Sequence, residues 1–379
     1  MNTSKMHSAQ HSAEPTLLVA LELSLKKWQL AMAPGGSVKR SVQVVEGGNY
    51  AALMDAIKTT LKKYKLPLHT AVTLCYEAGR DGFYPYRRLC EMGYRVWLVD
   101  SSSIEVNRRQ RHAKNDSIDA DKLLLLMQRY YGGENALHRV RVPSVAEEDE
   151  RQLTRERDVL REACNAERMR MQSLLFAQGW REVPHAVSKL GAWLQTHSQQ
   201  ISAHLWSRLQ RDYARLHLSD AHLKALDKQL KEQRVNADEH GSRIAHSAQR
   251  LCRLKGVADI SAGIMASELF GWRKFRNRRE VGSSAGLTPT PYDSGNSVRE
   301  QGISKAGNKR VRRVLIELSW KWLQHQPDSG LSQWYNKRFG GQGKRLRRNG
   351  IVALARKLLI ALWHYLEHGV VPDGAALKA

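Results

Sequence analysis

The spacing of apolar and polar residues predicts a mixed α/β domain in the N-terminal part of the chain. Turn residues such as Pro34-Gly35-Gly36 separate three short apolar runs, which predict strands at residues 17–23, 28–33 and 41–45. A helix, a strand, a helix and a strand are predicted next, at residues 50–64, 71–76, 84–92 and 94–99. A further helix is predicted from about Asp116. The order βββαβαβα is typical of a mixed sheet flanked by helices.

Helical periodicity dominates the middle of the chain. Ser144 and Glu147 form a capping-box pair, so a long charged helix is predicted from Ser144 to about Phe176. We interpret this helix as an arm and a dimer contact. Ser219-Asp220 predicts a cap between two further helices, at residues 189–216 and 219–245.

The C-terminal part contains a glycine turn and a basic segment. Gly256 predicts a turn between two helices within residues 251–269, an arrangement that resembles a helix-hairpin-helix, whose backbone N–H groups could hold phosphate. Residues 285–313 have the glycines and prolines of exposed loops and lead into a basic helix, predicted to start near Lys305 with Ser304 as its cap. The chain is thus predicted to comprise a disordered tail, an α/β domain, a helical arm and a basic, mostly helical C-terminal domain, at residues 1–15, 16–142, 143–248 and 249–379.

The charge of the chain favours a nucleic-acid partner. The 61 Lys and Arg residues outnumber the 37 Asp and Glu residues, which gives a formal net charge of +24, and there are 10 Trp and 12 Tyr. Residues 271–360 concentrate this charge, with 20 basic and 5 acidic residues. A ribosomal or membrane-surface protein would share this composition, so charge alone leaves those classes open.

The cysteines and the apolar runs predict a cytoplasmic protein. The cysteines lack zinc-ligand spacing, which predicts reduced core thiols at Cys75, Cys90, Cys164 and Cys252. The N-terminal residues lack the apolar stretch of a signal peptide. No apolar run reaches the ~18 residues that a membrane span needs, so no membrane segment is expected.

Acidic residues in two strands and one helix start predict a metal site. Asp116 and Asp119 lie three positions apart, so a helix would put both carboxylates on one face. Converging carboxylates repel unless a cation lies between them, and Mg2+ prefers such hard oxygen ligands. Glu22 lies within the first predicted strand and Glu77 follows the fourth, where a polar group is costly unless it serves a site. Two alternatives stay open: acids in a first turn complement the helix dipole, and strand-end carboxylates reach water.

These acids lie in segments that resemble a known transposase family. The acid of ALELSLKKW, the Glu-Ala-Gly of CYEAGRDGF and the paired aspartates of KNDSIDADKL look like the N-terminal domain of the insertion-sequence transposases of the IS one-ten family. The resemblance implies an RuvC-like, ribonuclease H-type fold whose DEDD tetrad binds Mg2+ through Glu22, Glu77, Asp116 and Asp119. Glu22 stands where the family pattern has Asp, and its extra methylene moves the carboxylate by about 1.5 Å.

A second segment resembles the same family. Residues 285–313 are similar to its C-terminal segment, and Ser294 in PYDSGNS matches the nucleophilic serine of the family. Without the resemblance, a serine before glycine is typical of a turn, and Ser297 and Ser304 are the nearest alternative nucleophiles. The resemblance extends from about Leu17 to Leu366.

The resemblance implies a DNA recombinase that exchanges strands through a covalent phosphoserine intermediate. It implies donor and target DNA as substrates, a structured bridge RNA as guide, and a homo-oligomer in which dimers assemble into a tetramer. It also implies a bacterial, nucleoid-associated location. Base pairing with the guide would carry sequence specificity, while basic side chains would follow the phosphate backbone.

Clustered basic residues are predicted to contact the phosphate backbone of the nucleic acid. The alternative for each of them is a solvated side chain without such a contact. Those just upstream of Asp116 are Arg108, Arg109, Arg111 and Lys114. Those of the C-terminal part are Arg273, Lys274, Arg276, Arg278, Arg279, Arg299, Lys305, Lys309, Arg310, Arg312, Arg313, Lys344, Arg345, Arg347 and Arg348.

Two other functions stay open. A metal-dependent junction endonuclease would use the acids with water as the nucleophile. A nucleic-acid-binding protein with an impaired active site would result if Glu22 weakened metal binding.

Overall fold

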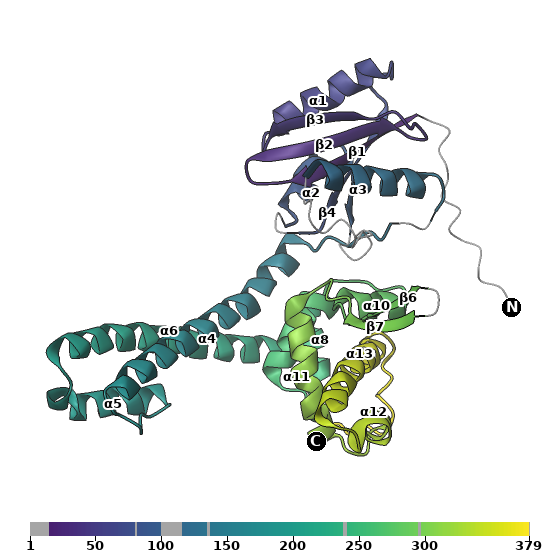
Figure 1. Ribbon diagram of the computed structural model, residues 1–379. Helices are drawn as coiled ribbons and strands as arrows, with labels where there is room; N and C mark the ends of the chain where they lie inside the picture. The colour runs from purple at the N-terminus through teal and green to yellow at the C-terminus, as the bar shows by residue number, and fades with distance from the viewer. Residues whose placement is uncertain are drawn as a thin grey trace. The chain divides into compact units, whose positions relative to one another are not determined.

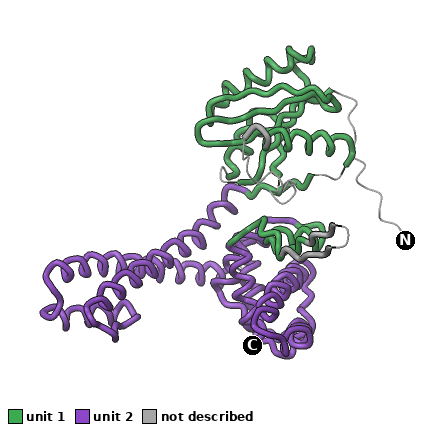
Figure 2. Tube along the Cα trace, viewed as in Figure 1, with its two compact units in different colours: residues 1–143, 275–309 green, residues 144–274, 310–379 purple. Residues whose placement is uncertain are grey.

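The protein folds into two compact units, one built on a β-sheet and the other helical. The computed structural model describes residues 15–79, 82–99, 116–134, 137–237, 241–294 and 297–378, except for the side chains of residues 116–118, 291–294 and 297–301. Figure 1 labels the helices and strands, and Figure 2 marks the units. Unit 1 comprises residues 1–143 and 275–309, and unit 2 comprises residues 144–274 and 310–379.

A five-stranded mixed sheet forms the core of unit 1 (Figure 1). Its strands are β1 (Thr16–Leu23), β2 (Lys27–Pro34), β3 (Ser41–Glu46), β4 (Ala71–Glu77) and β5 (Arg95–Val99). They lie in the order β3-β2-β1-β4-β5. β1 pairs antiparallel with β2 and parallel with β4, and β5 is parallel to β4. The predicted mixed α/β fold is confirmed, and every predicted element of this region is present.

Helices cover both faces of the sheet. The helices are α1 (Tyr50–Lys63), α2 (Tyr84–Glu91) and α3 (Asp116–Tyr131). Residues of α1 and α2 share one core with Val19 and Leu21 of β1, whereas residues of α3 share the other core with Leu18 and Ala20. Because successive strand residues point to opposite faces, β1 is apolar on both sides.

A short helix and a hairpin complete unit 1. They are α10 (Arg278–Ser284), β6 (Pro289–Ser294) and β7 (Ser297–Ile303). β6 and β7 pair antiparallel, so the prediction of exposed loops here is wrong. The strand was hidden in the sequence because Pro289 and Pro291 lack the N–H donors of a ladder, and the register shifts between them.

A pair of long helices begins unit 2. α4 (Val145–Ala177) starts with the predicted capping box, because Glu147 N–H donates to Ser144 Oγ and Ser144 N–H donates to Glu147 Oε2. α4 packs against α6 (Ala203–Val235) (Figure 1). Between them lie α5 (Val187–Thr196) and the short 3₁₀ helix η3 (Ser198–Gln200).

The predicted helices at residues 189–216 and 219–245 are wrong in their boundaries. The break falls at η3, and α6 runs through Ser219 and Asp220 without a cap. Leu209, Leu216 and Leu226 are buried along it, so packing continues across these residues. Asp220 pairs with Lys224 one turn later, 2.8 Å away, which satisfies an acid inside a helix.

Shorter helices form the rest of unit 2. They are α8 (Arg243–Cys252), α9 (Asp259–Met265), the π-helical turn η4 (Ala266–Phe270), α11 (Lys309–His325), α12 (Gly330–Tyr335), the π-helical turn η5 (Asn336–Gly340) and α13 (Lys344–His368). Gly256, with φ of +87°, makes the predicted turn between α8 and α9. α11 starts at Lys309 and not near Lys305, because Lys305 has φ of +57°, outside the helical region. No described helix is long and apolar enough to cross a membrane.

Candidate active site and nucleic-acid surface

Glu22 and Glu77 lie at the ends of two adjacent parallel strands. Leu21 of β1 is paired with Tyr76 of β4, and Glu22 and Glu77 are the next residues along these two strands. Glu22 is half-buried and Glu77 is exposed. The sheet therefore brings together two carboxylates that are 55 positions apart in the sequence.

Both acids belong to the sheet face that α3 covers. Leu21 and Tyr76 contribute to the core beneath α1 and α2, whereas Ala20 and Cys75 contribute to the core beneath α3. Since side chains alternate along a strand, Glu22 and Glu77 point to the same side as Ala20 and Cys75. The face that carries the acids is thus the one against which the third acidic segment packs.

The direction of α3 places its start near the same strand ends. At its far end, the Tyr131 ring packs on the backbone of Gly35, whose N–H donates to Thr16 O at the beginning of β1. From Tyr131 back to Asp119 the helix covers about 18 Å, and from Thr16 to Glu22 the strand covers about 20 Å. The first turns of α3 therefore lie toward the end of β1 that carries Glu22.

The structure describes the side chain of Asp119 but not that of Asp116. Asp119 is half-buried and forms an ion pair with Lys122 at 3.2 Å. Asp116 is the first residue of α3, and its side chain lies outside the described part. Among the described side chains, no three His, Cys, Asp or Glu residues lie close enough to hold a metal ion. The structure thus brings Glu22 and Glu77 together, whereas Asp119 belongs to the helix that covers this face of the sheet and does not complete a group of three with them. A site with four acids stays a prediction.

Ser294 is the last residue of β6, at the tip of the β6–β7 hairpin. Its backbone is paired with Ser297, the first residue of β7 and one of the two alternative nucleophiles. The side chains of both serines lie outside the described part. Ser304, the other alternative, follows β7 and its N–H donates to Thr288 O. A hairpin tip is a suitable place for a residue that must reach a DNA backbone, and the nucleophilic role of Ser294 stays a prediction.

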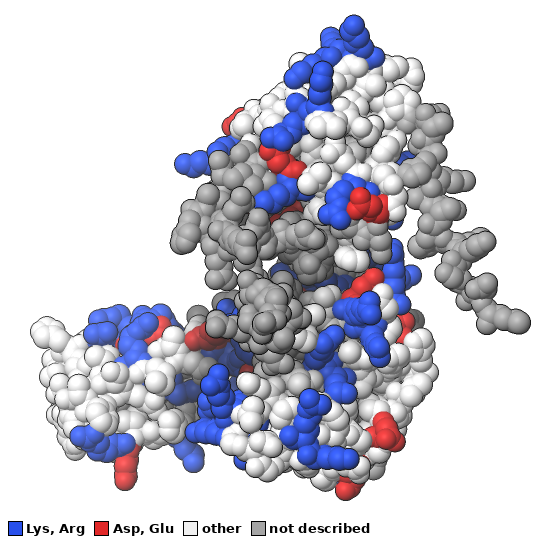
Figure 3. All heavy atoms as spheres, turned by 45° about the vertical axis from the view of Figure 1, so that its right-hand side comes forward, with Lys and Arg blue, Asp and Glu red and all other residues white. Residues whose placement is uncertain are grey.

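Most of the residues predicted to contact the nucleic-acid backbone fall into three groups. The arm of four basic residues upstream of Asp116 lies outside the described part, as does the Arg299 side chain. A second group is exposed, around α10, at the end of the hairpin segment and in the first turns of α13: Lys274, Arg276, Arg278, Arg279, Lys305, Lys309, Lys344, Arg345, Arg347 and Arg348. Arg273 and Arg312 are half-buried and belong to none of the groups. Figure 3 shows that Lys and Arg side chains are widespread on the face that it presents. Arg310 and Arg313 form the third group, because they are engaged inside unit 2.

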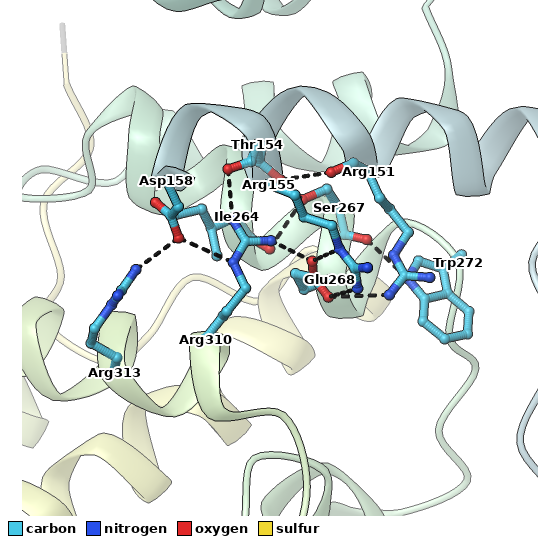
Figure 4. A network of polar contacts seen from close by, with 10 residues as sticks. All are labelled: Arg151, Thr154, Arg155, Asp158, Ile264, Ser267, Glu268, Trp272, Arg310 and Arg313. Carbon is cyan, nitrogen blue, oxygen red and sulfur yellow. Dashed lines mark hydrogen bonds and ion pairs between the residues drawn. The ribbon is translucent and has the colours of Figure 1, made fainter. Parts of the chain in front are cut away.

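A buried glutamate organises that third group (Figure 4). Glu268, in the turn η4, is fully buried and forms ion pairs with Arg151 at 3.2 Å and Arg155 at 2.8 Å, both from α4. It also pairs with Arg310 of α11. Arg310 extends the network to Asp158, at 3.1 Å. The network, which we call the Glu268 cluster, joins α4, η4 and α11.

Arg313 and Trp272 complete the Glu268 cluster. Arg313 donates to Asp158 at 2.7 Å, and the Arg151 guanidinium lies 4.9 Å from the Trp272 ring centroid. These contacts give Arg310 and Arg313 a structural role. The sequence patterns do not predict the Glu268 cluster. Its one signal in the sequence is an acid inside the apolar run IMASELFGW.

The cluster keeps Glu268 ionised. Burial by itself would raise the pKa of this carboxyl, but the hydrogen bond from Arg155 and the charges of Arg151, Arg155 and Arg310 outweigh it. Together they lower the pKa of Glu268 to about 2. A carboxylate held in this way is part of the scaffold and is unsuited to proton transfer near neutral pH.

Comparison with known proteins gives the class. A model of the transposase IS116/IS110/IS902 family matches residues 248–335. A protein of Sinorhizobium fredii whose name describes it as a transposase is 35% identical over 376 residues, which cover 96% of this chain and 94% of the relative. The transposases for insertion sequence elements IS1328 of Yersinia enterocolitica and IS1533 of Leptospira borgpetersenii are each 27% identical. They match over 78% and 81% of this chain, and over 84% of each relative. The class that these proteins share is the transposases.

The chain belongs to the IS116/IS110/IS902 transposase family. The similarity to the Sinorhizobium fredii relative extends over nearly the whole of both chains, and the family model covers the segment from the second half of α8 to the end of α12. The resemblance found in the sequence is therefore confirmed.

Proposed function

We propose that the protein is a transposase that exchanges DNA strands during the movement of an insertion sequence. Membership of the family and the names of the relatives support this function. The net charge of +24 supports a polyanionic substrate. The observation that carries the active-site proposal is the position of Glu22 and Glu77, side by side at parallel strand ends beneath the helix of Asp116 and Asp119.

Unit 1 would supply a ribonuclease H-like catalytic fold. Three antiparallel strands, β1 to β3, are followed by β4 and β5 parallel to β1, and this order supports the assignment. The four acids offer only carboxylate oxygens, which fit Mg2+. We propose that Glu22, Glu77, Asp116 and Asp119 hold this ion, which when bound would stabilise negative charge on the phosphoryl oxygens.

Ser294 would act as the nucleophile. Its hydroxyl oxygen attacks the phosphorus of a phosphodiester, the bond to the leaving deoxyribose oxygen breaks, and that oxygen takes the serine proton. A hydroxyl of a second strand then attacks the phosphoserine, the phosphorus–Oγ bond breaks, and Ser294 regains a proton. The number of phosphoester bonds stays constant, so the exchange needs no ATP.

A structured bridge RNA would guide this reaction, and a homo-oligomer would carry it out. Pairing of the RNA with donor and target DNA would supply the specificity, because basic side chains contact phosphates without reading sequence. The exposed cluster Lys344, Arg345, Arg347 and Arg348 in α13 would follow the backbone of either nucleic acid. Dimers that assemble into a tetramer would bring four strands together.

The serine is tested by trapping the covalent intermediate. We expect Ser294→Ala to abolish the protein–DNA adduct that survives denaturing electrophoresis, in a reaction with Mg2+, bridge RNA and labelled donor DNA. Ser297→Ala is the matched control and should keep the adduct. An adduct in Ser294→Ala and none in Ser297→Ala would assign the nucleophile to Ser297. Cleavage by Ser294→Ala without any adduct would instead favour a hydrolase that uses water.

The acidic site is tested in the same assay. Asp119→Asn should lower strand exchange by at least about 100-fold, because it removes one proposed metal ligand. Asp121→Asn is the control, since Asp121 lies on the same helix and pairs with Arg40 at 2.9 Å. Full activity of Asp119→Asn in Mg2+ would remove this residue from the proposed site.

A further inference from the structure

Unit 2 contains a cleft that no step of the proposed reaction uses. It has a volume of about 860 Å3 and lies between the Gly256 turn, α9, α11 and the segment at residues 376–378, near the C-terminus. A volume of this size is typical of sites that take a small molecule or one unit of a polymer. All the residues that line it belong to unit 2.

The walls of the cleft are held in place by hydrogen bonds to backbone atoms of the protein. The buried Gln326 side chain donates to Lys255 O at 2.9 Å and to Ala376 O at 2.8 Å, and it accepts from Ala376 N–H at 2.8 Å. Leu254 is paired with Leu377 across the same two segments. The turn and residues 376–378 therefore form one wall, which is anchored at the C-terminal end of α11.

The surface of the cleft is apolar inside and aromatic at its rim. Val257, Ile264 and Leu318 are buried in its floor. Ile260 and Trp320 are 41% and 44% exposed, a large apolar area to leave in water. Trp320 is thus available for stacking against a flat ligand.

Lysines lie beside the apolar surface. Lys255, Lys321 and Lys378 are exposed at the cleft, and none forms an ion pair with a carboxylate of the described part. Lys378 Nζ donates to Val257 O at 2.7 Å, and Lys321 Nζ donates to Gln324 Oε1 at 3.4 Å. Of the two acids in the lining, Asp158 is already engaged by Arg310 and Arg313, which leaves Glu317. Positive charge therefore dominates the rim.

We propose that this cleft binds an unpaired nucleotide of a nucleic-acid strand. Its base would stack on Trp320 above the apolar floor, and its phosphates would lie against Lys255, Lys321 and Lys378. An exposed aromatic ring beside lysines is the combination that recognises single strands, whereas a duplex keeps its bases stacked on one another. This inference rests on the proposed nucleic-acid function but is independent of strand exchange.

Fluorescence anisotropy with labelled oligonucleotides tests the site on the full chain. The probes are a short oligothymidylate, an oligouridylate of equal length, and a mixed-sequence duplex. Trp320→Ala should weaken binding of the single-stranded probes by roughly 5-fold or more, the range measured for loss of one base-stacking platform. Trp320→Phe should keep most of the affinity, whereas Trp320→Leu should not. Duplex affinity should change much less.

The controls separate the site from charge alone. Lys321→Gln should weaken single-strand binding, whereas Lys231→Gln, an exposed lysine of α6 outside the cleft, should not. The ratio of the oligothymidylate and oligouridylate affinities assigns the strand to DNA or RNA. Equal losses for duplex and single strand, or unchanged single-strand affinity in Trp320→Ala, would overturn the proposal. Unchanged affinity with an altered oligomeric state would assign the cleft to protein contacts instead. If the protein binds single strands through Trp320 but does not exchange DNA strands, the proposed nucleotide site is kept and the proposed reaction is refuted.

Discussion

Glu268 shows how one side chain can decide the packing of several helices. It is fully buried, and its charge is balanced by arginines from two helices that are far apart in the sequence. Buried ion pairs add little over an apolar core, but breaking one side leaves a charge without compensation. The contribution of Glu268 is therefore visible mainly when it is removed.

The substitution Glu268→Gln should destabilise the protein by about 3 kcal/mol or more, because Arg151 stays buried and loses its carboxylate partner. The measurement is urea unfolding followed by circular dichroism. Glu156→Gln, an exposed glutamate of α4, is the control and should stay within about 0.5 kcal/mol of the wild type. A change in Glu268→Gln no larger than that of the control would contradict the structural role.

The pH dependence provides a second readout of the same variant. The folded-state pKa of Glu268, about 2, lies below its ordinary value of 4.5, so its stabilising effect is present above pH 4.5. That effect is lost as the pH falls from about 4.5 toward 2, because the carboxyl becomes protonated. The stability difference between wild type and Glu268→Gln should therefore shrink over this range.

At the scale of elements, short turns determine where helices meet. Gly256 has φ of +87°, and a Cβ there would lie 3.0 Å from His325 Cβ on α11. The turn thus needs glycine for its backbone and also for its close approach to α11. It forms one wall of the cleft.

Gly256→Ala should lower the free energy of unfolding by roughly 1–3 kcal/mol, the cost of a left-handed alanine with a tight contact. It should also weaken single-strand binding. Gly341→Ala is the matched control, because its φ is −85° and no heavy atom lies within 4 Å of an added Cβ. Thermal unfolding of both variants gives the comparison. Equal melting temperatures would contradict the account of the turn.

At the scale of the whole molecule, charge governs association. The net charge of +24 is spread over exposed side chains, so binding to nucleic acid releases counterions. Ion pairs within the fold engage acids and arginines alike, such as Glu268 with Arg155 and Asp158 with Arg310, so they do not reduce the excess of basic side chains. The surface is therefore strongly basic where it is free to bind.

The affinity for duplex DNA should fall linearly with log salt, by about 0.9 log units per decade of salt for each phosphate contacted. Replacing Lys344, Arg345, Arg347 and Arg348 with glutamine should reduce this slope. Replacing Lys58 and Lys62 of α1, which are exposed but have no proposed role, should not. Titrations of DNA at several salt concentrations measure both slopes. An unchanged slope in the α13 variant would exclude this cluster from the contact.

Local sequence patterns were reliable where the physical signal is local. Apolar runs and turn residues placed β1 to β5, and the Ser144–Glu147 pair placed the start of α4, because each depends on neighbours within a few positions. Prediction failed at Ser219-Asp220, where the apolar stripe of α6 overrides a capping signal, and at β6, where prolines hide a strand.

The sequence by itself determined the elements of this protein, its charge and the positions of its acids. Only the tertiary structure decided that β1 pairs with β4, which sets Glu22 beside Glu77, and that Arg310 reaches Asp158, 152 positions away. It likewise decided that Trp320 faces a cleft walled by the end of the chain. The physical reason is that such contacts depend on which apolar faces pack together across long loops, whereas periodicity reports only one face of one element at a time.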